Sequence, residues 1–319
     1  MNKITIKIAS GILLSLNLVF VQAQKPSEYK IVWEENFDKP ALDKSVWNLE
    51  NNKIGGGNAE FQFYRPDNVS IEKLNDGNSC LVLSAKKENH NCRPATSGRI
   101  NTKGKLSIKY GKIDVRVSIP KTANGLWPAF WLMGEDKDQV GWPRCGEIDV
   151  IEMGNNKGIE NGMTDRFFNG ACHWGESFNR GKYPNLVQAS VSDYSLQEGF
   201  HLFTLIWTPD SINMYLDKDK FPTRKPYFAM SINGENTPGF PARYFHKPFH
   251  LIANLAVGGY FTGLPSPSKK AIYVSSKNEN FQKITALPVN GTPVKYYIDY
   301  IRIYQNGTPG EELNIAHKP

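Results

Sequence analysis

The sequence predicts an all-β protein in which two antiparallel sheets pack as a sandwich. Short runs rich in β-branched and aromatic residues recur along the chain, and each run is followed by a turn. Turn-forming pairs such as Asn124-Gly125 and Asn233-Gly234 separate these runs. No stretch shows a long apolar repeat of 3.6 residues, which would indicate an amphipathic helix. Together these observations favour packed sheets over a helical or mixed fold.

Strands are expected wherever such a run occurs. The expected strands are 29–33, 80–85, 112–119, 147–153, 202–207, 212–216, 249–257 and 296–304. In 112–119 the apolar residues occupy every second position, which is the period of a strand with one buried face. Four long and weakly periodic stretches, 53–67, 154–168, 174–192 and 258–280, are expected to be loops that shape a binding surface.

The first 23 residues have the pattern of a secretory signal peptide. Lys3 and Lys7 give a basic start, 8–21 is largely apolar, and the segment ending at Ala23 resembles a signal-peptidase site. The apolar stretch is shorter than the ~20 residues that span a bilayer, so we expect cleavage after Ala23 rather than a membrane anchor. We therefore expect an exported protein, periplasmic or extracellular, in which residues 24–319 form a single β-sandwich domain.

The charge of the chain does not identify a partner. The formal net charge is +7, and loss of Lys3 and Lys7 with the signal peptide, which has no acidic residue, lowers it to +5. Basic pairs such as Lys86-Lys87 are isolated, whereas a nucleic-acid site needs a concentrated stripe. We expect no nucleic-acid partner, no membrane span and a monomer. An anionic polysaccharide stays open as a substrate.

The four cysteines do not have the spacing of a metal site. Cys80, Cys92, Cys145 and Cys172 form no C-x-x-C pair, so zinc is not expected. In an exported protein they allow two disulfide bonds with three connectivities, and the sequence does not choose among these. Cys145 lies two residues before Glu147, but no Cys–His pairing supports a nucleophilic thiol, and we expect a structural role.

Three acids lie close together in the segment 147–152, which reads Glu-Ile-Asp-Val-Ile-Glu. Alternate residues of a strand share a face, so Glu147 and Asp149 point the same way, whereas Glu152 points to the other side. That side is the core, where an unpaired carboxylate is unfavourable. A one-residue β-bulge at Val150-Ile151 would return Glu152 to the face of the other two acids. We therefore expect this bulge.

Tryptophans precede the acids. Trp127 and Trp131 lie in the run 125–133, and Trp142, in a turn of Gly and Pro, is expected to be the most exposed. Aromatic faces can stack on sugar rings. Three carboxylates on one face suit glycoside hydrolysis, in which one attacks the anomeric carbon and another, held protonated, protonates the leaving oxygen. The third can help to separate their pKa values, and the proximity of acids on one strand predicts retention of configuration.

A series of other segments accompanies the acidic run in a recognisable order. They are 58–64 (NAEFQFY), 98–104 (GRINTKG), 127–133 (WPAFWLM), 173–174 (HW), 251–259 (LIANLAVGG) and 297–304 (YIDYIRIY). With the run 147–152, which matches the pattern E-[hydrophobic]-D-x-x-E, they resemble glycoside hydrolase family 16. The longer, bulged form of this pattern resembles the laminarinase-like branch, the endo-β-1,3(4)-glucanases. The likeness covers nearly the whole chain after the signal peptide.

The resemblance implies a β-jelly-roll sandwich with an open substrate cleft, and endo-acting hydrolysis with retention and no catalytic cofactor. It assigns Glu147 as the nucleophile, Asp149 as its supporting acid and Glu152 as the general acid/base. The residues that it places along the cleft are Asn58, Arg99, Trp127, Trp131, Trp142, His173 and Asn254. Alternatives stay open for two of these: His173 as a structural histidine and Arg99 as a surface ion pair.

The chain departs from the family pattern at two places. Members have an acid near the start as a ligand of a structural calcium ion, where this chain has Asn36, although Asp299 offers one oxygen ligand. A structural calcium is therefore left open. A tryptophan that is common in laminarinases after 258–259 is replaced here by Tyr260-Phe261, and the following loop is longer.

Three functions are weighed. We expect an endo-β-glucanase that acts on β-1,3- or mixed β-1,3/1,4-glucans. A second hypothesis keeps the fold and mechanism and changes the polymer to an algal galactan, as in agarases, porphyranases or carrageenases; Arg166, Arg180 and Lys182 would favour it if they were clustered. The third is a non-catalytic glycan-binding sandwich, and the presence of all three acids argues against it.

Overall fold

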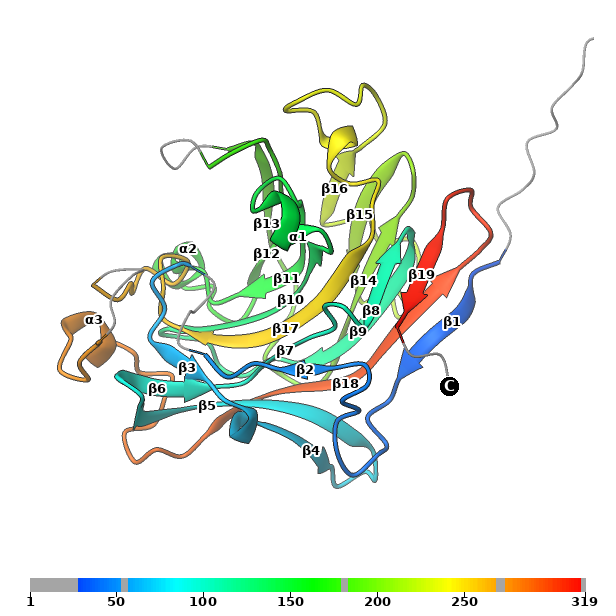
Figure 1. Cartoon of the computed structure of the whole chain (residues 1–319). Helices are drawn as coiled ribbons and strands as arrows, with labels where there is room; N and C mark the ends of the chain where they lie inside the picture. Colours follow the sequence, from blue (N-terminus) through cyan, green and yellow to red (C-terminus); the bar gives the residue numbers. More distant parts are fainter. Residues whose placement is uncertain (1–27, 53–56, 179–182, 268–272, 317–319) are drawn as a thin grey trace, which may run out of the picture.

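The computed structural model describes residues 28–52, 57–178, 183–267 and 273–316. Two large curved sheets pack face to face, and short helices lie at the ends of the sandwich (Figure 1). The helices are α1 (Lys137–Val140), α2 (Asn156–Glu160) and α3 (Glu279–Gln282), with the 3-10 turns η1 (Pro66–Asn68) and η2 (Pro241–Arg243). The predicted all-β sandwich is confirmed.

The first sheet, here called the back sheet, has ten strands in the order β16-β15-β14-β9-β18-β5-β6-β3, with β1 beside β18 and β4 beside β5. Its strands are β1 (Lys30–Glu35), β3 (Gln62–Tyr64), β4 (Val69–Lys73), β5 (Ser79–His90), β6 (Arg93–Ser97), β9 (Gly111–Ser118), β14 (His201–Trp207), β15 (Ser211–Leu216), β16 (Phe228–Ser231) and β18 (Val294–Gln305). Apart from the parallel pair β3–β6, the strand pairs described in this sheet are antiparallel.

The second sheet, here called the cleft sheet, has nine strands in the order β13-β12-β11-β10-β17-β7-β2, and β8 pairs with both β17 and β19. Its strands are β2 (Asn48–Leu49), β7 (Arg99–Asn101), β8 (Leu106–Lys109), β10 (Leu126–Gly134), β11 (Glu147–Met153), β12 (Phe167–His173), β13 (Asn185–Val191), β17 (Phe249–Val257) and β19 (Glu312–Ile315). The acidic segment forms β11, between β10 and β12 near the middle of this sheet.

The hydrophobic core lies between the two sheets. Val115 of β9 and Phe203 of β14 are buried from the back sheet, and Phe130 of β10 and Ile148 of β11 are buried from the cleft sheet, all in one cluster. Burial of such apolar surface is the main favourable term in folding. Because the inner face of the cleft sheet is committed to this core, the polar residues of β11 are left on its outer face.

All eight predicted strands coincide with observed strands to within a few residues at the ends. Three of the predicted loops contain regular structure: 174–192 contains the edge strand β13, 53–67 the short strand β3, and 154–168 the helix α2. Along β13, exposed residues alternate with half-buried ones. Apolar residues such as Val187 and Val191 are among the exposed ones, so the apolar pattern of this strand does not mark a buried face. The long loops do shape a binding surface, since Asn58, Asn155, Phe178 and Phe261 from them line the cleft described below.

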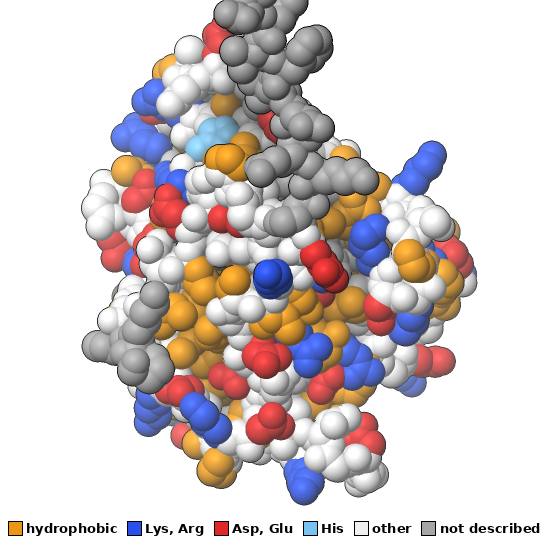
Figure 2. Space-filling view, turned by 90° about the vertical axis from the view of Figure 1, so that its right-hand side faces the viewer, with side chains coloured by type: hydrophobic (Ala, Val, Ile, Leu, Met, Phe, Trp, Pro, Cys, Tyr) orange, Lys and Arg blue, Asp and Glu red, His pale blue; other side chains and the backbone are white. Residues whose placement is uncertain are grey.

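The charge is dispersed on one face of the molecule. On this face, seen in Figure 2, Lys and Arg side chains are interspersed with Asp and Glu and form no basic stripe. Within the described ranges, no helix has the length and apolar character needed to cross a membrane. The predicted signal peptide, 1–23, lies outside the described residues.

All four cysteines fall in the described part of the chain, and each has a free thiol. Cys80 lies on β5 of the back sheet and Cys172 on β12 of the cleft sheet, both buried, whereas Cys92 is exposed. The two disulfide bonds that export would allow are therefore not formed. Cys145 is buried with its Sγ 3.3 Å from the Sδ of Met133, and burial raises the pKa of its thiol to about 12. This supports a structural role for Cys145 rather than a nucleophilic one.

Candidate active site

The bulge predicted in β11 is present. Val150 has no partner on β10, because the register shifts between Asp149 and Ile151, and the register with β12 shifts at the same point. Val150 and Ile151 are both buried in the core, with 1% exposure each. The extra residue returns Glu152 to the outer face, where it lines one cavity with Glu147 and Asp149.

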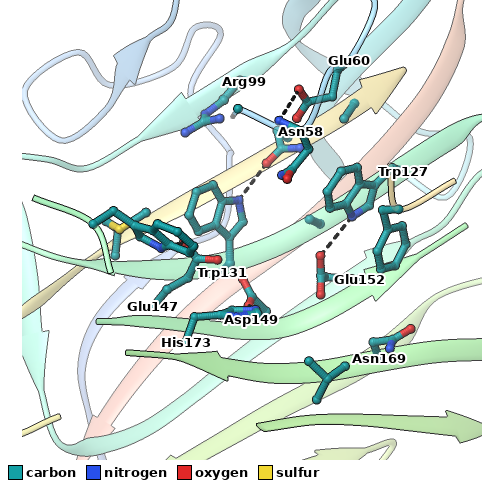
Figure 3. Close-up of a pocket in the computed structure, with 18 of the residues that line it drawn as sticks. Asn58, Glu60, Arg99, Trp127, Trp131, Glu147, Asp149, Glu152, Asn169 and His173 are labelled. Carbon is teal, nitrogen blue, oxygen red and sulfur yellow. Dashed lines mark hydrogen bonds and ion pairs between the residues drawn. The ribbon is translucent and has the colours of Figure 1, made fainter. Parts of the chain in front are cut away.

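A tryptophan indole donates a hydrogen bond to each of the two outer carboxylates. Nε1–H of Trp142 donates to Oε2 of Glu147 at 2.9 Å. Nε1–H of Trp127 donates to Oε1 of Glu152 at 3.1 Å (Figure 3). An N–H donor fixes the position of a carboxyl group and favours its ionised form. The two tryptophans thus orient the acids as well as lining the cleft.

Burial raises the pKa values of both outer acids. The pKa of Glu147 rises to about 7, and the charge of Asp149 adds to the effect of burial, while His173 and Trp142 oppose it. The pKa of Glu152 is raised well above its usual value by burial, with further contributions from Asp149 and Glu147. Glu152 is therefore suited to hold a proton, and Glu147 is the acid that ionises more readily.

His173 of β12 lies beside the acids. Its Nε2 is 3.2 Å from Oδ2 of Asp149, and one polar atom from each of Glu147, Asp149 and His173 lies within 4.8 Å of the other two. Burial lowers the pKa of His173, but the hydrogen bond to Asp149 and the charges of the three acids outweigh burial and raise this pKa to about 9. A protonated His173 thus offsets the repulsion among three neighbouring carboxylates.

All seven residues predicted along the cleft line one cavity of about 810 Å³ on the outer face of the cleft sheet, together with the three acids. They come from distant parts of the chain. Arg99 on β7 is paired with Asn254 on β17, and Asn254 is paired in turn with Ala129 on β10, the strand that bears Trp127 and Trp131. The order of the strands brings these segments together (Figure 3).

Trp131 is held from two sides. Its Nε1–H donates to Oδ1 of Asn254 at 2.7 Å, and the guanidinium of Arg99 lies 5.0 Å from its ring centroid. Arg99 also pairs with Glu50, with 2.8 Å between Nε and Oε1. Arg99 thus makes an ion pair, but it is only 8% exposed and packs against an aromatic residue of the cleft.

Aromatic residues from two loops flank the tryptophans that bind the acids. Next to Trp142, the ring centroids of Tyr183 and Phe178 lie at 4.6 and 5.6 Å. Next to Trp127, the ring of Phe261 is stacked in parallel, with 4.4 Å between centroids and 11° between planes. Trp142, expected to be the most exposed of the three cleft tryptophans, is half-buried by this packing.

The sequence reasoning missed several residues that line the cleft: Glu60, Tyr64, Lys137, Asn155, Asn169, Phe178, Tyr183, Val187 and Phe261. Glu60 accepts a hydrogen bond from the backbone N–H of Asn58 at 3.0 Å (Figure 3), and burial raises its pKa to about 7. Glu60 and Tyr64 lie in the segment 58–64 that carried the resemblance, so a signal existed for them. Phe178 and Tyr183 lie in an aperiodic loop that offers no such signal.

Acidic residues outnumber basic residues in the cleft. Its described lining has four acids, Glu60, Glu147, Asp149 and Glu152, against Arg99, Lys137 and the protonated His173. Arg99 is paired with Glu50 and His173 with Asp149, so Lys137 is the one cation of the described lining outside these pairs. Arg166 is absent from the lining and lies 3.7 Å from Asp165, and Arg180 and Lys182 fall outside the described residues.

The oxygen atoms considered for a calcium ion lie beside arginine side chains. Oδ1 of Asn36 accepts a hydrogen bond from Nη2 of Arg302 at 3.2 Å, and the carboxylate of Asp299 is paired with Arg116. A guanidinium next to each oxygen repels a further cation. The side chains of Asn36 and Asp299 therefore do not fit a calcium ion.

Comparison with known sequences identifies related proteins. Residues 57–244 match the sequence profile of Glycosyl hydrolases family 16. Glucan endo-1,3-beta-glucosidase A1 of Niallia circulans is 32% identical over 296 residues, which cover 86% of this chain and 38% of the relative. A beta-glucanase of Rhodothermus marinus is 28% identical and covers 89% of this chain and 88% of the relative. The chain thus spans under half of the first relative and nearly all of the second.

A solved structure agrees with these sequence matches. A glycoside hydrolase family 16 endo-glucanase from Bacteroides ovatus superposes with a TM-score of 0.70 at 34% identity. The match covers 86% of this chain and all of the other. The similarity therefore includes both sheets and the strands that carry the cleft.

Proposed function

Because this chain belongs to Glycosyl hydrolases family 16, we propose that it is a retaining endo-β-glucanase that cleaves β-1,3- or mixed β-1,3/1,4-glucans. The observation that carries the proposal is the outer face of β11, where the bulge places Glu147, Asp149 and Glu152 together in a cleft lined by tryptophans. The relatives support the substrate class, since their names describe hydrolysis of such glucans.

The geometry accommodates a two-step displacement. The carboxylate of Glu147 attacks the anomeric carbon while the carboxyl of Glu152 gives its proton to the glycosidic oxygen, so that the aglycone half leaves as an alcohol. The glycosyl ester on Glu147 is then hydrolysed by water, whose proton returns to Glu152. Asp149, paired with His173, precedes Glu152 on β11, and its charge raises the pKa of both Glu147 and Glu152, which helps Glu152 to keep its proton. This chemistry uses no cofactor.

The charge of the cleft argues against the sulfated-galactan alternative. A sulfated polymer needs several cations along its binding surface, whereas in the described lining Arg99 and His173 are paired with acids and Lys137 is the one cation outside these pairs. A neutral glucan is recognised by stacking on aromatic rings and by hydrogen bonds. Trp131, Trp142 and the amide of Asn58 offer both kinds of contact.

Digestion of defined polymers tests the proposal. The protein is incubated with laminarin, cereal mixed-linked β-glucan, κ-carrageenan and agarose, and the products are sized by chromatography. We expect rapid shortening of one or both glucans and none of the galactans, with NMR showing the β-anomer as the first product. Cleavage of a galactan alone would replace the glucanase by the alternative, and intact glucans would contradict the proposal.

Two matched carboxylate variants separate an enzyme from a glycan-binding protein. Glu147→Gln removes the proposed nucleophile and is expected to lower turnover by about 10³-fold or more. Glu72→Gln changes a carboxylate on β4 of the back sheet, where it pairs with Lys295, and should keep full turnover. Equal turnover by both variants would show that Glu147 does no chemistry.

We also propose that the protein is exported after cleavage near Ala23 and acts as a monomer. The support is the basic and apolar pattern of 1–23 and the dispersed charge on the face seen in Figure 2. N-terminal sequencing of the secreted protein and its mass by light scattering test both points. A mature chain that begins at Met1, or a stable dimer, would contradict them.

A further inference from the structure

The contact between Phe261 and Trp127 lies next to the proposed general acid/base. Trp127 extends from β10, and its indole N–H reaches Oε1 of Glu152 at 3.1 Å (Figure 3). The ring of Phe261 covers one face of this indole in a nearly parallel stack. Stacked aromatic pairs restrict one another's orientation, because the contact area is lost when either ring turns.

The loop that carries Phe261 is itself tightly held. The backbone N–H of Asn156, the first residue of α2, donates to the carbonyl oxygen of Phe261 at 2.9 Å. The next residue back, Tyr260, donates its backbone N–H to the carbonyl of Asn58 at 2.9 Å. Gly259 and Leu264 exchange two backbone hydrogen bonds that close the turn. The ring of Phe261 is thus fixed from the backbone, independently of Trp127.

A glycine lets the same loop approach Trp127 closely. Gly259 has φ +96°, and a Cβ at this position would lie 3.1 Å from Cγ of Glu60 and 3.5 Å from Cζ3 of Trp127. The turn at Gly259 therefore runs near the indole that Phe261 covers. The indole has little freedom to turn its N–H away from Glu152.

We propose that Phe261 is a positioning residue for the general acid/base: by stacking on Trp127 it keeps the indole N–H on the carboxyl group of Glu152. This inference rests on the proposed glucanase function. It assigns Phe261 no contact with the reacting atoms, and its effect reaches Glu152 through one hydrogen bond. That hydrogen bond orients the proton donor toward the glycosidic oxygen and favours ionised Glu152 once its proton has been given.

The charges around Glu152 determine how this role appears in a pH profile. The titratable groups that face it are Asp149 and Glu147 on its own strand, His173 on β12 and Tyr183 from the loop before β13. None of these changes when Phe261 is replaced. The Trp127 hydrogen bond lowers the pKa of Glu152, so its weakening raises that pKa. Because Glu152 must be protonated to act, the alkaline limb of kcat/KM should then move to higher pH.

The first experiment replaces Phe261 by Leu, which keeps an apolar side chain and removes the flat ring. We expect kcat/KM on cereal β-glucan to fall about tenfold at the pH optimum, a part of the 10²–10⁴-fold that acid–base catalysis contributes. We expect the alkaline limb to move up by about 0.5 to 1 pH unit, as the loss of a hydrogen bond to a charged group implies. An unchanged limb would overturn the inference even if activity fell.

A substrate with an activated leaving group separates positioning from binding. Departure of 2,4-dinitrophenolate from an aryl β-glucan oligosaccharide needs no proton, and kcat/KM reports only the steps up to that departure. Phe261→Leu should therefore leave kcat/KM on this substrate within about twofold of wild type. An equal fall on the polymer and on the activated substrate would mean that Phe261 only binds sugar or only stabilises the fold.

A double-mutant cycle tests whether Phe261 acts through Trp127. Trp127→Phe keeps a ring on β10 and removes the N–H, so it should give the same shift of the alkaline limb as Phe261→Leu. The double variant should be no worse than Trp127→Phe alone, since both changes remove one interaction. If the falls in kcat/KM of the two single variants multiplied in the double variant, Phe261 and Trp127 would have independent roles, and the inference would be contradicted.

Controls keep the result interpretable. Phe261→Tyr retains the stacked ring and should restore the wild-type profile, and Phe240→Leu changes an exposed phenylalanine outside the cleft lining and should have no effect. If Phe261→Leu fails to fold in thermal unfolding, Phe261→Met gives the same test with a flexible side chain. A wild-type protein that cleaves no glucan refutes the proposed function, whereas an active wild type with an unchanged Phe261→Leu profile refutes only this inference.

Discussion

The hydroxyl group of Tyr227 donates a hydrogen bond to the carbonyl oxygen of Val150, the residue at which β11 bulges. Tyr227 directly precedes β16 of the back sheet, so the bond joins the two sheets across the core. Val150 has no cross-strand partner in either register of β11. A residue of the back sheet thus stabilises the irregularity that brings Glu152 into the cleft.

Removal of this hydroxyl should weaken both the fold and the site. Tyr227→Phe leaves a buried carbonyl with one partner fewer, and we expect the free energy of unfolding to fall by about 1–3 kcal/mol. We also expect a lower kcat on laminarin, because the bulge positions Glu152. Urea unfolding and steady-state kinetics measure the two effects, and Tyr215→Phe on β15 is the control. Lower stability with wild-type kcat would show that the bulge persists without the bond.

Gly170 of β12 lies opposite the bulge and leaves room for Tyr227. A Cβ at Gly170 would lie 2.9 Å from both Sδ of Met214 and Cε2 of Tyr227, and 3.0 Å from Cβ of Phe228. We expect Gly170→Ala to destabilise the protein by about 1–3 kcal/mol, because the packed core must shift to admit the methyl group. Thermal unfolding checks this. A melting temperature equal to that of the wild type would mean that the two sheets separate here at little cost.

Loss of His173 should shift the whole pH profile. The positive charge of His173 lowers the pKa values of both Glu147 and Glu152. In His173→Gln both pKa values should rise. The acid limb of the profile reports ionisation of Glu147, and the alkaline limb reports loss of the proton from Glu152. Both limbs should therefore move to higher pH. The profile of kcat/KM on laminarin measures the shift, with His90→Gln outside the cleft lining as the control. A profile that stays in place or moves down would contradict the role of His173.

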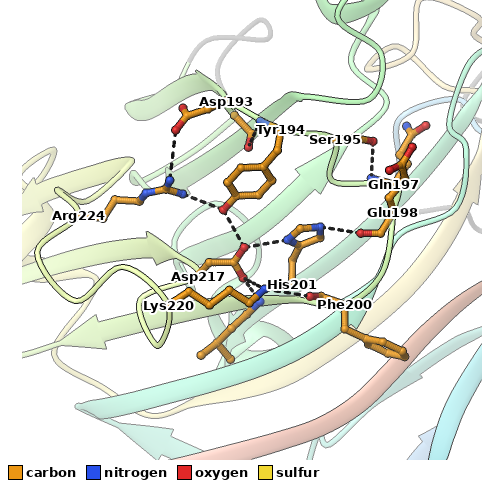
Figure 4. Close-up of polar contacts among 12 residues, drawn as sticks. Asp193, Tyr194, Ser195, Gln197, Glu198, Phe200, His201, Asp217, Lys220 and Arg224 are labelled. Carbon is orange, nitrogen blue, oxygen red and sulfur yellow. Dashed lines mark hydrogen bonds and ion pairs between the residues drawn. The ribbon is translucent and has the colours of Figure 1, made fainter. Parts of the chain in front are cut away.

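A polar cluster outside the cleft should govern stability in acid (Figure 4). The carboxylate of Asp217 accepts hydrogen bonds from the backbone of Leu202 at 2.8 Å, from Tyr194 at 2.7 Å and from Nδ1 of His201 at 2.8 Å. Burial alone would raise the pKa of Asp217, but these bonds outweigh it and lower the pKa to about 2. Since the pKa of Asp217 is lower in the folded protein, its ionised form stabilises the fold fully at pH values above its ordinary pKa near 3.8. This contribution to stability is lost as the pH falls from there through about 2.

Asp217→Asn tests this cluster. Asp217 has φ +46°, a conformation that Asn also tolerates, so the substitution changes mainly the charge. We expect the free energy of unfolding at pH 7 to fall by about 2 kcal/mol. The difference from the wild type should shrink as the pH approaches 2. Asp193→Asn, at a carboxylate that is 81% exposed, should stay within about 0.5 kcal/mol of the wild type. If the difference in the free energy of unfolding between Asp217→Asn and the wild type stayed constant from pH 7 to pH 2, the charge of Asp217 would not contribute to stability.

Much of the fold and of the acidic strand was predictable from local patterns. A period of two residues specifies which face of a strand is buried, and this rule alone required a bulge between Asp149 and Glu152. Val150 and Ile151 are indeed both buried there. The edge strand β13 was not predicted, because its exposed positions alternate with half-buried ones and carry no clear division into apolar and polar residues.

The contacts around the acids were not predictable in the same way. Glu152 and Trp127 are 25 residues apart, and Phe261 follows Trp127 by more than a hundred residues. Even so, Phe261 stacks on Trp127, and Trp127 donates a hydrogen bond to Glu152. Trp142 and Trp127 were expected to stack on sugars, and the structure adds that each donates to a carboxylate. The sequence left Asp299 open as an oxygen ligand for calcium, and in the structure its carboxylate is paired with Arg116.

Local residue order was therefore enough to identify the sandwich, the acidic strand and its bulge, because alternation along a strand is a property of adjacent residues. The resemblance to a known family also identified seven cleft residues, six of them within the matching segments and Trp142 outside these. The folded chain alone decided which partner each acid meets, since this depends on the order of strands in the cleft sheet and on loops without periodicity. The hydrogen bond from Trp127 to Glu152 and the stack of Phe261 on Trp127 are two contacts that only the tertiary structure decided.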